Sequence, residues 1–274
     1  MADSHAQFSG NIPEIYDQHL GPAFFAAPAA HMAKQIADAV SGVSNPRVLE
    51  VACGTGIVTE ALRGALAADI EIIATDLNPA MLEYAQSVRG DLANVNWQQA
   101  DGQDLSTLDG AFDAVVCQFG LMFFPEKEKG LAAMAGVLNP GGTLAVSTWN
   151  SLEKNTLPGL GQEVLATFFD ENPPMFLSVP FGMHDPGVVT ALMMQAGIDE
   201  VQIETRGFEY ERPKARHLAV GMVQGNPGIH EINERANAPA EEIIDAMEAA
   251  MARDFGDNPL RAHSHAIFAS GVKG

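Results

Sequence analysis

The sequence predicts an α/β fold with a doubly wound, mostly parallel sheet, and three observations indicate it. Short apolar runs alternate with helical patterns between residues 47 and 149. An acidic residue or a glycine turn follows most of the runs, as at the ends of parallel strands that approach a ligand. The intervening helical patterns can cover both faces of the sheet. The first run, Arg47–Ala52, breaks into a glycine turn at Cys53–Gly56, where the main chain can approach a ligand closely.

Residues 1–45, ahead of this turn, are expected to form an N-terminal helical flap, either packed on the core or closing over a ligand. A short helix should end at Gly21-Pro22, and a second helix should cover Ala26–Val40. Within the core, residues 46–149, Asn78 and Pro79 fit a helix cap and a first helical residue. The expected core strands are 47–52, 70–75, 95–99, 112–117 and 143–149, and the expected helices are 57–67, 81–88 and 125–138.

The regular alternation stops after residue 149. Residues 150–185 are rich in proline and phenylalanine, which predicts a lid or a loosely packed insertion. Residues 186–274 return to the core pattern and include a helical insertion. Their expected elements are a helix at 186–196, a strand at 201–210, a loop-rich stretch at 225–239, an amphipathic helix at 241–255 and a strand at 263–272.

Composition limits the partners of the chain. With 47% hydrophobic and 18% charged residues among 274, a soluble globular protein is expected. The net charge of −20 repels phosphate backbones and anionic membranes, so nucleic acid is not an expected partner. No apolar run is long enough for membrane insertion, and Cys53 and Cys117 have no metal spacing. We therefore expect a cytoplasmic protein with no metal, and the sequence leaves a homodimer open.

Three carboxylates lie at neighbouring strand ends, namely Glu50, Asp76 and Asp101. Asp76 follows the glycine turn by about 20 residues, which suits a carboxylate that binds ribose hydroxyls. The third glycine of a dinucleotide motif is replaced by Thr59, and Glu50 would face a pyrophosphate at a cost. These features favour a ligand with a ribose and a positive charge over a nicotinamide dinucleotide.

Five motifs within roughly residues 47–149 resemble those of class I S-adenosylmethionine-dependent methyltransferases. The nearest group contains the ubiquinone and menaquinone C-methyltransferases and many small-molecule methyltransferases. The resemblance implies a Rossmann-like sheet of seven strands with an antiparallel C-terminal strand. One departure is Ala52, which stands where many members carry glycine. The motifs are VLEVACGTG at 48–56, ATDLNPAML at 74–82, DGQDL at 101–105, FDAVVCQFG at 112–120 and LNPGG at 138–142.

The resemblance also implies roles for individual residues around S-adenosylmethionine. The methionine part is assigned to Glu50 and the main chain of the glycine turn, with Tyr16 closing over it from the flap. The ribose is assigned to Asp76, and the passage toward the transferred methyl group is assigned to Gln118 and Phe119. The complete set expected to bind the cofactor is Tyr16, Glu50, Ala52, Cys53, Gly54, Thr55, Gly56, Asp76, Leu77, Met81, Asp101, Gly102, Gln103, Gln118 and Phe119.

The expected reaction is methyl transfer to a small, apolar or aromatic acceptor, with the methylated atom (O, N, S or C) left open. Alignment of the acceptor serves a thiolate or an amine, whereas a hydroxyl or an acidic carbon needs a base. Candidate bases are His19 and His184, and the candidate acceptor-binding residues are Phe24, Phe123, Trp149 and Phe181. The alternatives are an NAD(P)-dependent oxidoreductase on a similar fold and a non-catalytic protein that binds S-adenosylmethionine.

Overall fold

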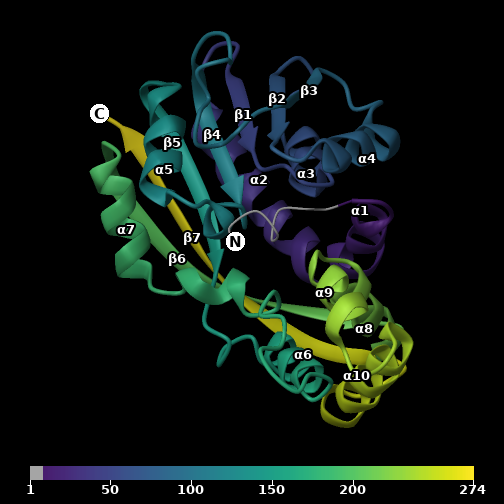
Figure 1. Ribbon diagram of the computed structural model, residues 1–274. Helices are drawn as coiled ribbons and strands as arrows, with labels where there is room; N and C mark the ends of the chain where they lie inside the picture. Colours follow the sequence, from purple (N-terminus) through teal and green to yellow (C-terminus); the bar gives the residue numbers. More distant parts are fainter. Residues whose placement is uncertain (1–8) are drawn as a thin grey trace.

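A seven-stranded sheet organises residues 9–274, the part of the chain that the computed structural model describes (Figure 1). Its strands lie in the order β3-β2-β1-β4-β5-β7-β6. β7 is antiparallel to both of its neighbours, and the strands from β3 to β5 are parallel, so the predicted fold class is confirmed. The strands are β1 (Arg47–Val51), β2 (Glu71–Asp76), β3 (Val95–Gln99), β4 (Phe112–Gln118), β5 (Leu138–Trp149), β6 (Ile198–Arg212) and β7 (Leu260–Lys273).

Helices cover both faces of this sheet (Figure 1). Because both faces are covered, the central strands are largely apolar, and Val48, Leu49 and Val115 are fully buried. One face carries α2 (Ala26–Val40), α3 (Ile57–Ala65) and α4 (Pro79–Arg89), and the other carries α5 (Lys127–Gly136) and α7 (Pro186–Gln195).

The antiparallel pair of β6 and β7 extends past the end of the neighbouring strand. β5 pairs with β7 only as far as Trp149↔Ala266, whereas the β6–β7 ladder continues to Arg212↔Leu260. The extended end of this strand pair lies beside a separate group of helices, seen at the bottom of Figure 1. They are α6 (Thr156–Ala166), α8 (Ala215–Gln224), α9 (Gly228–Arg235) and α10 (Ala240–Phe255).

The N-terminal segment consists of α1 (Ile12–Ile15) and η2 (Tyr16–Phe25), a π-helix that continues directly into α2. The prediction that Gly21-Pro22 ends a helix is therefore wrong. The Ala26 N–H donates to the Gly21 carbonyl, five residues earlier, in the pattern of a π-helix. The wider turn accommodates Pro22, which has no N–H and would clash in a regular α-helix.

Residues 150–185 are more regular than a loose lid, since they contain α6 and the 3₁₀ turn η4 (Val179–Met183). Pro158 lies in the first turn of α6, where a backbone N–H has no partner within the helix. Likewise, α9 occupies much of the stretch expected to be loop. The LNPGG motif, expected to precede the strand at 143–149, lies inside β5, where the ladder with β4 shifts register between Phe112 and Ala114.

Candidate functional site

The loop after β1 has an unusual backbone. Ala52, Gly54 and Gly56 have φ angles of 58°, 55° and 86°, in the left-handed region. Glycine adopts this region easily, but Ala52 does so under strain. The Gly56 N–H closes the turn on the Cys53 carbonyl over 2.9 Å, immediately before α3. A Cβ on Gly54 would meet nothing within 4 Å, so this part of the loop is open to a ligand.

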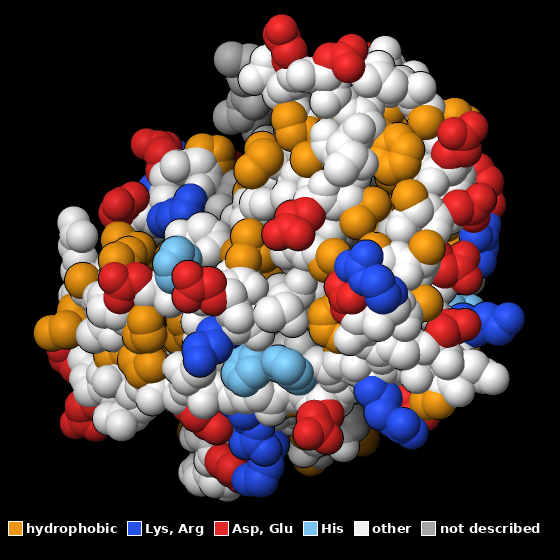
Figure 2. Space-filling model, turned by 90° about the horizontal axis from the view of Figure 1, so that it is seen from below, with side chains coloured by type: hydrophobic (Ala, Val, Ile, Leu, Met, Phe, Trp, Pro, Cys, Tyr) orange, Lys and Arg blue, Asp and Glu red, His pale blue; other side chains and the backbone are white. Residues whose placement is uncertain are grey.

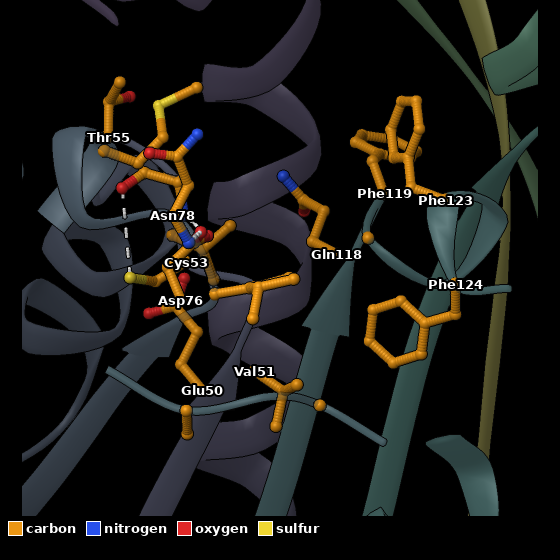
Figure 3. Close-up of a pocket in the computed structure, with 18 of the residues that line it drawn as sticks. Glu50, Val51, Cys53, Thr55, Asp76, Asn78, Gln118, Phe119, Phe123 and Phe124 are labelled. Atoms are coloured by element: carbon orange, nitrogen blue, oxygen red, sulfur yellow. Dashed lines mark hydrogen bonds between the residues drawn. The ribbon is translucent and has the colours of Figure 1, made fainter. Parts of the chain in front are cut away.

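A cavity of about 360 Å³ lies at the carboxyl ends of the central strands. Its walls include Glu50, Asp76 and Asp101, so the three predicted carboxylates do converge. Figure 3 shows polar side chains from β1 and β2 on one side of this cavity and aromatic side chains after β4 on the other. Gln118 lies between the two groups. We call this space the polar cavity.

Glu50 is the most deeply buried carboxylate of the polar cavity, with 1% of its surface exposed. Its Oε2 accepts a hydrogen bond from the Thr59 hydroxyl at 2.6 Å. Burial raises the pKa of Glu50 to about 8, against the lowering effect of the Thr59 bond, and the nearby Asp76 raises it further. A cation placed beside Glu50 would therefore favour the ionised carboxylate.

Asp76 is held by the main chain around it. One carboxylate oxygen accepts from the Gly54 N–H and the other from the Asn78 N–H, each at 2.8 Å. Burial raises the pKa of Asp76, although these backbone bonds oppose the change. Each oxygen keeps further acceptor capacity that a pair of hydroxyl groups could use.

A second cavity, of about 110 Å³, adjoins the polar cavity. Both include Tyr16, Phe25, Phe119 and Phe123 among their lining residues, so these four form a shared wall. We call the second space the apolar cavity. Its remaining lining residues are Leu20, Phe24, Trp149, Pro158, Phe176, Leu177, Pro180, Phe181, Met222 and Asn226.

The shared wall is a packed aromatic cluster. The rings of Phe119 and Trp149 stack with centroids 3.7 Å apart, and Tyr16 stacks on Phe25 at 4.8 Å. Phe119 has a positive φ of 53°, and this strained backbone turns its ring toward Trp149 after β4 ends. The four predicted acceptor-binding residues, Phe24, Phe123, Trp149 and Phe181, all line the apolar cavity.

Comparison with known proteins identifies the family. Residues 48–142 match the family model described as a methyltransferase domain. The ubiquinone/menaquinone biosynthesis C-methyltransferase of Idiomarina loihiensis is 31% identical over 174 residues, which cover 58% of this chain and 68% of that protein. The corresponding enzyme of Proteus mirabilis is 30% identical over 178 residues, which cover 59% and 70%. The chain belongs to the class I S-adenosylmethionine-dependent methyltransferase family.

Solved structures share the fold of this methyltransferase. Phosphoethanolamine N-methyltransferase 2 of Haemonchus contortus has a TM-score of 0.58 at 13% identity, covering 95% of this chain and 56% of that one. The [4+2]-cyclase SpnF has a TM-score of 0.56 at 18% identity, covering 96% and 93%. At this identity the likeness concerns the fold alone. Family membership gives the activity, methyl transfer, and the cofactor, S-adenosylmethionine.

The loop after β3, which the sequence predicts to bind the cofactor, forms another wall of the polar cavity. The Asp101 carboxylate accepts from the Gln103 N–H at 2.9 Å, and the Gln103 side chain accepts from the Glu126 N–H at 2.8 Å. A Cβ on Gly102 would lie 2.4 Å from the Phe124 ring, so only glycine fits here. Fourteen of the fifteen residues expected to bind the cofactor line the polar cavity, including these three, Leu77 and Met81.

Gly56 is the exception. It does not line the polar cavity, and its positive φ and a Trp97 ring 2.7 Å from a Cβ at this position account for the glycine. The two candidate bases also lie elsewhere. His19 packs against His217 with ring centroids 5.5 Å apart. Burial is the main cause that lowers the pKa of His19, and the nearby His217 adds to the lowering. His184 is exposed and contacts the Phe181 carbonyl through Nδ1 at 2.8 Å.

Several residues of the site had no signal in the sequence. The Asp17 carboxylate accepts from the Thr55 hydroxyl at 2.7 Å and from Arg89 Nη1 at 3.1 Å, which ties η2 to the glycine loop and to α4. Arg89 also donates to the Thr55 carbonyl at 2.9 Å. These partners lie tens of residues apart in the chain, so no local pattern could indicate them. Thr59 differs from these residues, because the sequence already showed it in place of the third glycine of a dinucleotide-binding motif.

Proposed function

We propose that this methyltransferase binds S-adenosylmethionine in the polar cavity and methylates a small apolar acceptor bound in the apolar cavity. The observation that supports this most is the shared aromatic wall between the two cavities. A sulfonium methyl group at this wall would meet an acceptor from the other side. The acceptor atom would then displace the neutral thioether of S-adenosylhomocysteine in line, as one bond forms and the S–CH₃ bond breaks.

The residues around the cofactor would act by binding and orientation. Glu50 would pair with the ammonium group of the methionine part, and Asp76 would accept the ribose hydroxyls. Tyr16 would close the cavity from η2, because it lines both spaces. Orientation of two reactants in this way is worth up to about 7–11 kcal/mol of the barrier.

The apolar cavity suits an acceptor of about one ring. An engineered apolar cavity of about 150 Å³ binds benzene, and the cavity here has about 110 Å³ in addition to the shared wall. Among the described residues that line it, Tyr16 alone has a titratable side chain, and burial followed by Asp17 raises its pKa. These residues therefore favour an acceptor atom that is nucleophilic without help from a base.

A pair of variants tests the division between the two cavities. We expect Asp76→Asn to weaken S-adenosylhomocysteine binding about 10–100-fold, because a charge-assisted bond to the ribose is lost. We expect Leu177→Trp to fill the apolar cavity, and so to raise the KM of the acceptor while the Kd of S-adenosylhomocysteine changes less than about twofold. Calorimetry gives the Kd, and mass spectrometry of one-ring thiols, amines and phenols gives turnover.

The two readouts separate the possible failures. Unchanged S-adenosylhomocysteine affinity in a folded Asp76→Asn variant would contradict the ribose assignment. If Leu177→Trp weakened S-adenosylhomocysteine binding as much as Asp76→Asn does, the proposal of two separate cavities would be contradicted. Turnover of none of the one-ring acceptors would contradict the proposed acceptor class.

We also infer a cytoplasmic location, because Cys53 and Cys117 are both free, buried thiols. None of the helices in residues 9–274 has the length and apolarity of a membrane span. A small-molecule acceptor fits the net charge of −20 better than a nucleic acid does. A homodimer is the assembly that light scattering should test first.

A further inference from the structure

Thr59 stands where a dinucleotide-binding motif would have its third glycine, and it is completely buried, with 0% of its surface exposed. It lies in the first turn of α3, directly after the glycine loop. Its hydroxyl points back to β1 and donates to Glu50 Oε2 at 2.6 Å. Helix packing alone does not require a hydroxyl at this position. We propose that Thr59 is a positioning residue, which holds the Glu50 carboxylate in the orientation that receives the ammonium group of the cofactor.

The geometry leaves Glu50 ready for one more partner. In the part of the chain that the structure describes, the Glu50 carboxylate accepts one hydrogen bond, and that bond comes from Thr59. It occupies Oε2, while Glu50 itself lines the polar cavity. The second oxygen is therefore available to a donor in the cavity. Rotation of the carboxylate about its Cγ–Cδ bond would break the bond from Thr59, so Thr59 limits where the second oxygen lies.

The charged and titratable groups near Glu50 come from several elements. Asp76 at the end of β2 opposes its ionisation, and Arg89 on α4 favours it. Two thiols lie close enough to interact with it, Cys53 in the glycine loop and Cys117 on β4, and burial raises the pKa of both. Neither thiol is ionised near neutral pH. Two groups favour the ionised form of Glu50, Arg89 through its charge and Thr59 through the hydrogen bond to Oε2.

The consequence is a pH dependence of cofactor binding, which depends on the proposed pairing of Glu50 with the ammonium group. Burial holds the pKa of Glu50 near 8, so the ligand-free enzyme is mostly protonated there at pH 7. An incoming ammonium group requires the ionised form, so binding releases a proton. Removal of the Thr59 hydroxyl raises the pKa of Glu50 further, because the bond to the charged form is lost.

The test is the affinity for S-adenosylhomocysteine of wild type, Thr59→Val and Thr59→Ser, measured by calorimetry at pH 7 and pH 9. If the hydroxyl lowers the pKa of Glu50 by one unit, Thr59→Val should weaken binding about 10-fold at pH 7 and about 2-fold at pH 9. The difference in affinity between wild type and Thr59→Val becomes smaller at pH 9 because Glu50 ionises in both proteins as the pH rises. Thr59→Ser keeps the hydroxyl and should stay within about 2-fold of wild type at both pH values.

A second comparison shows whether Thr59 acts through Glu50. In a Glu50→Gln background, Thr59→Val should change the affinity less than about 2-fold, because the carboxylate is already absent. Equal weakening at both pH values, or an undiminished effect in the Glu50→Gln background, would overturn the positioning role. Wild-type protein that fails to bind S-adenosylhomocysteine would instead overturn the cofactor site itself, and the role of Thr59 with it.

Discussion

At the residue scale, Glu50 creates a conflict between stability and ligand binding. Burial raises its pKa from an ordinary value of 4.5 to about 8, so the folded protein retains a proton that the unfolded chain releases. The contribution of Glu50 to stability is therefore fully present below pH 4.5. It is lost as the pH rises toward 8, because the folded state must then bury a charge. The residue that we assign to the cofactor thus destabilises the ligand-free enzyme at neutral pH.

Glu50→Gln should relieve this conflict. We expect the ligand-free variant to have a higher Tm than wild type at pH 8, a smaller gain at pH 6 and almost none at pH 4.5, because the amide does not ionise. Thermal unfolding followed by circular dichroism measures the difference. A constant difference in Tm between the two proteins from pH 4.5 to pH 8 would show that Glu50 does not titrate in this range.

Local chemistry decides which residues of the site could be predicted. Asn78 was expected to cap a helix, and its side chain does accept from the Ala80 N–H at 2.9 Å. Gly54 lies in the turn after β1 and Asp76 ends β2, so the parallel sheet brings them to one edge. His19 and His184 carried no such constraint. Their chemistry suited a base, but side-chain type alone gives no position relative to a cavity.

At the element scale, the π-helix η2 joins the two cavities. It contributes Tyr16, Phe24 and Phe25 to their walls. One polar connection between η2 and the core is the Asp17 carboxylate, which accepts from Thr55 and Arg89. The side chains of Asp17 and Arg89 are each only 14% exposed. Pairs with this little solvent are screened less than surface pairs. The Asp17 carboxylate therefore helps to hold η2 over the polar cavity.

A double-mutant cycle with Asp17→Asn and Arg89→Met measures this connection. We expect a coupling free energy of about 1–2 kcal/mol in urea unfolding, since the two groups form a charge-assisted bond with little solvent around it. The affinity for S-adenosylhomocysteine should also fall in each single variant. Lys34→Met with Asp38→Asn is a matched control, because that pair is exposed and should couple by less than about 0.5 kcal/mol. Additive effects of Asp17→Asn and Arg89→Met would contradict the role of the pair.

The elements themselves could be predicted wherever periodicity was strong. α2 and β3 have the expected bounds, and the amphipathic stripe of α10 is buried as expected. The errors fall where proline was taken as a sign of irregular structure, at Pro22 and in the proline-rich stretch 150–185. Pro158 lies in the first turn of α6, where a backbone N–H needs no helical partner, whereas Pro22 lies inside the π-helix η2, whose wider turn accommodates it.

At the scale of the whole molecule, the net charge of −20 means that the acidic side chains repel one another across the surface. Figure 2 shows Asp and Glu side chains over the face seen from below, between scattered Lys and Arg side chains. Self-repulsion of this kind destabilises the compact state and is screened by salt, because the Debye length falls from about 10 Å at 0.1 M to about 3 Å at 1 M.

Salt should therefore stabilise this methyltransferase. We expect Tm to rise by several degrees between 0.1 M and 1 M NaCl, and KCl should act equally, since screening depends on ionic strength. Differential scanning calorimetry measures the change. A falling Tm would mean that the screened ion pairs outweigh the repulsion. The sequence alone predicted the fold class, whereas the apolar cavity forms only where Leu177 and Met222 pack beside Tyr16, far away in the chain.

The separation of the two cavities has a consequence for how such an enzyme can evolve. The proposed cofactor pocket is formed by the strand ends of the sheet, whereas Leu177, Met222 and Asn226 of the apolar cavity belong to segments outside those strands. Mutations that accumulate in the second group would change which molecule fits without altering the methyl donor. Exchange of these segments between relatives is then a direct route to chimeric enzymes with new acceptors.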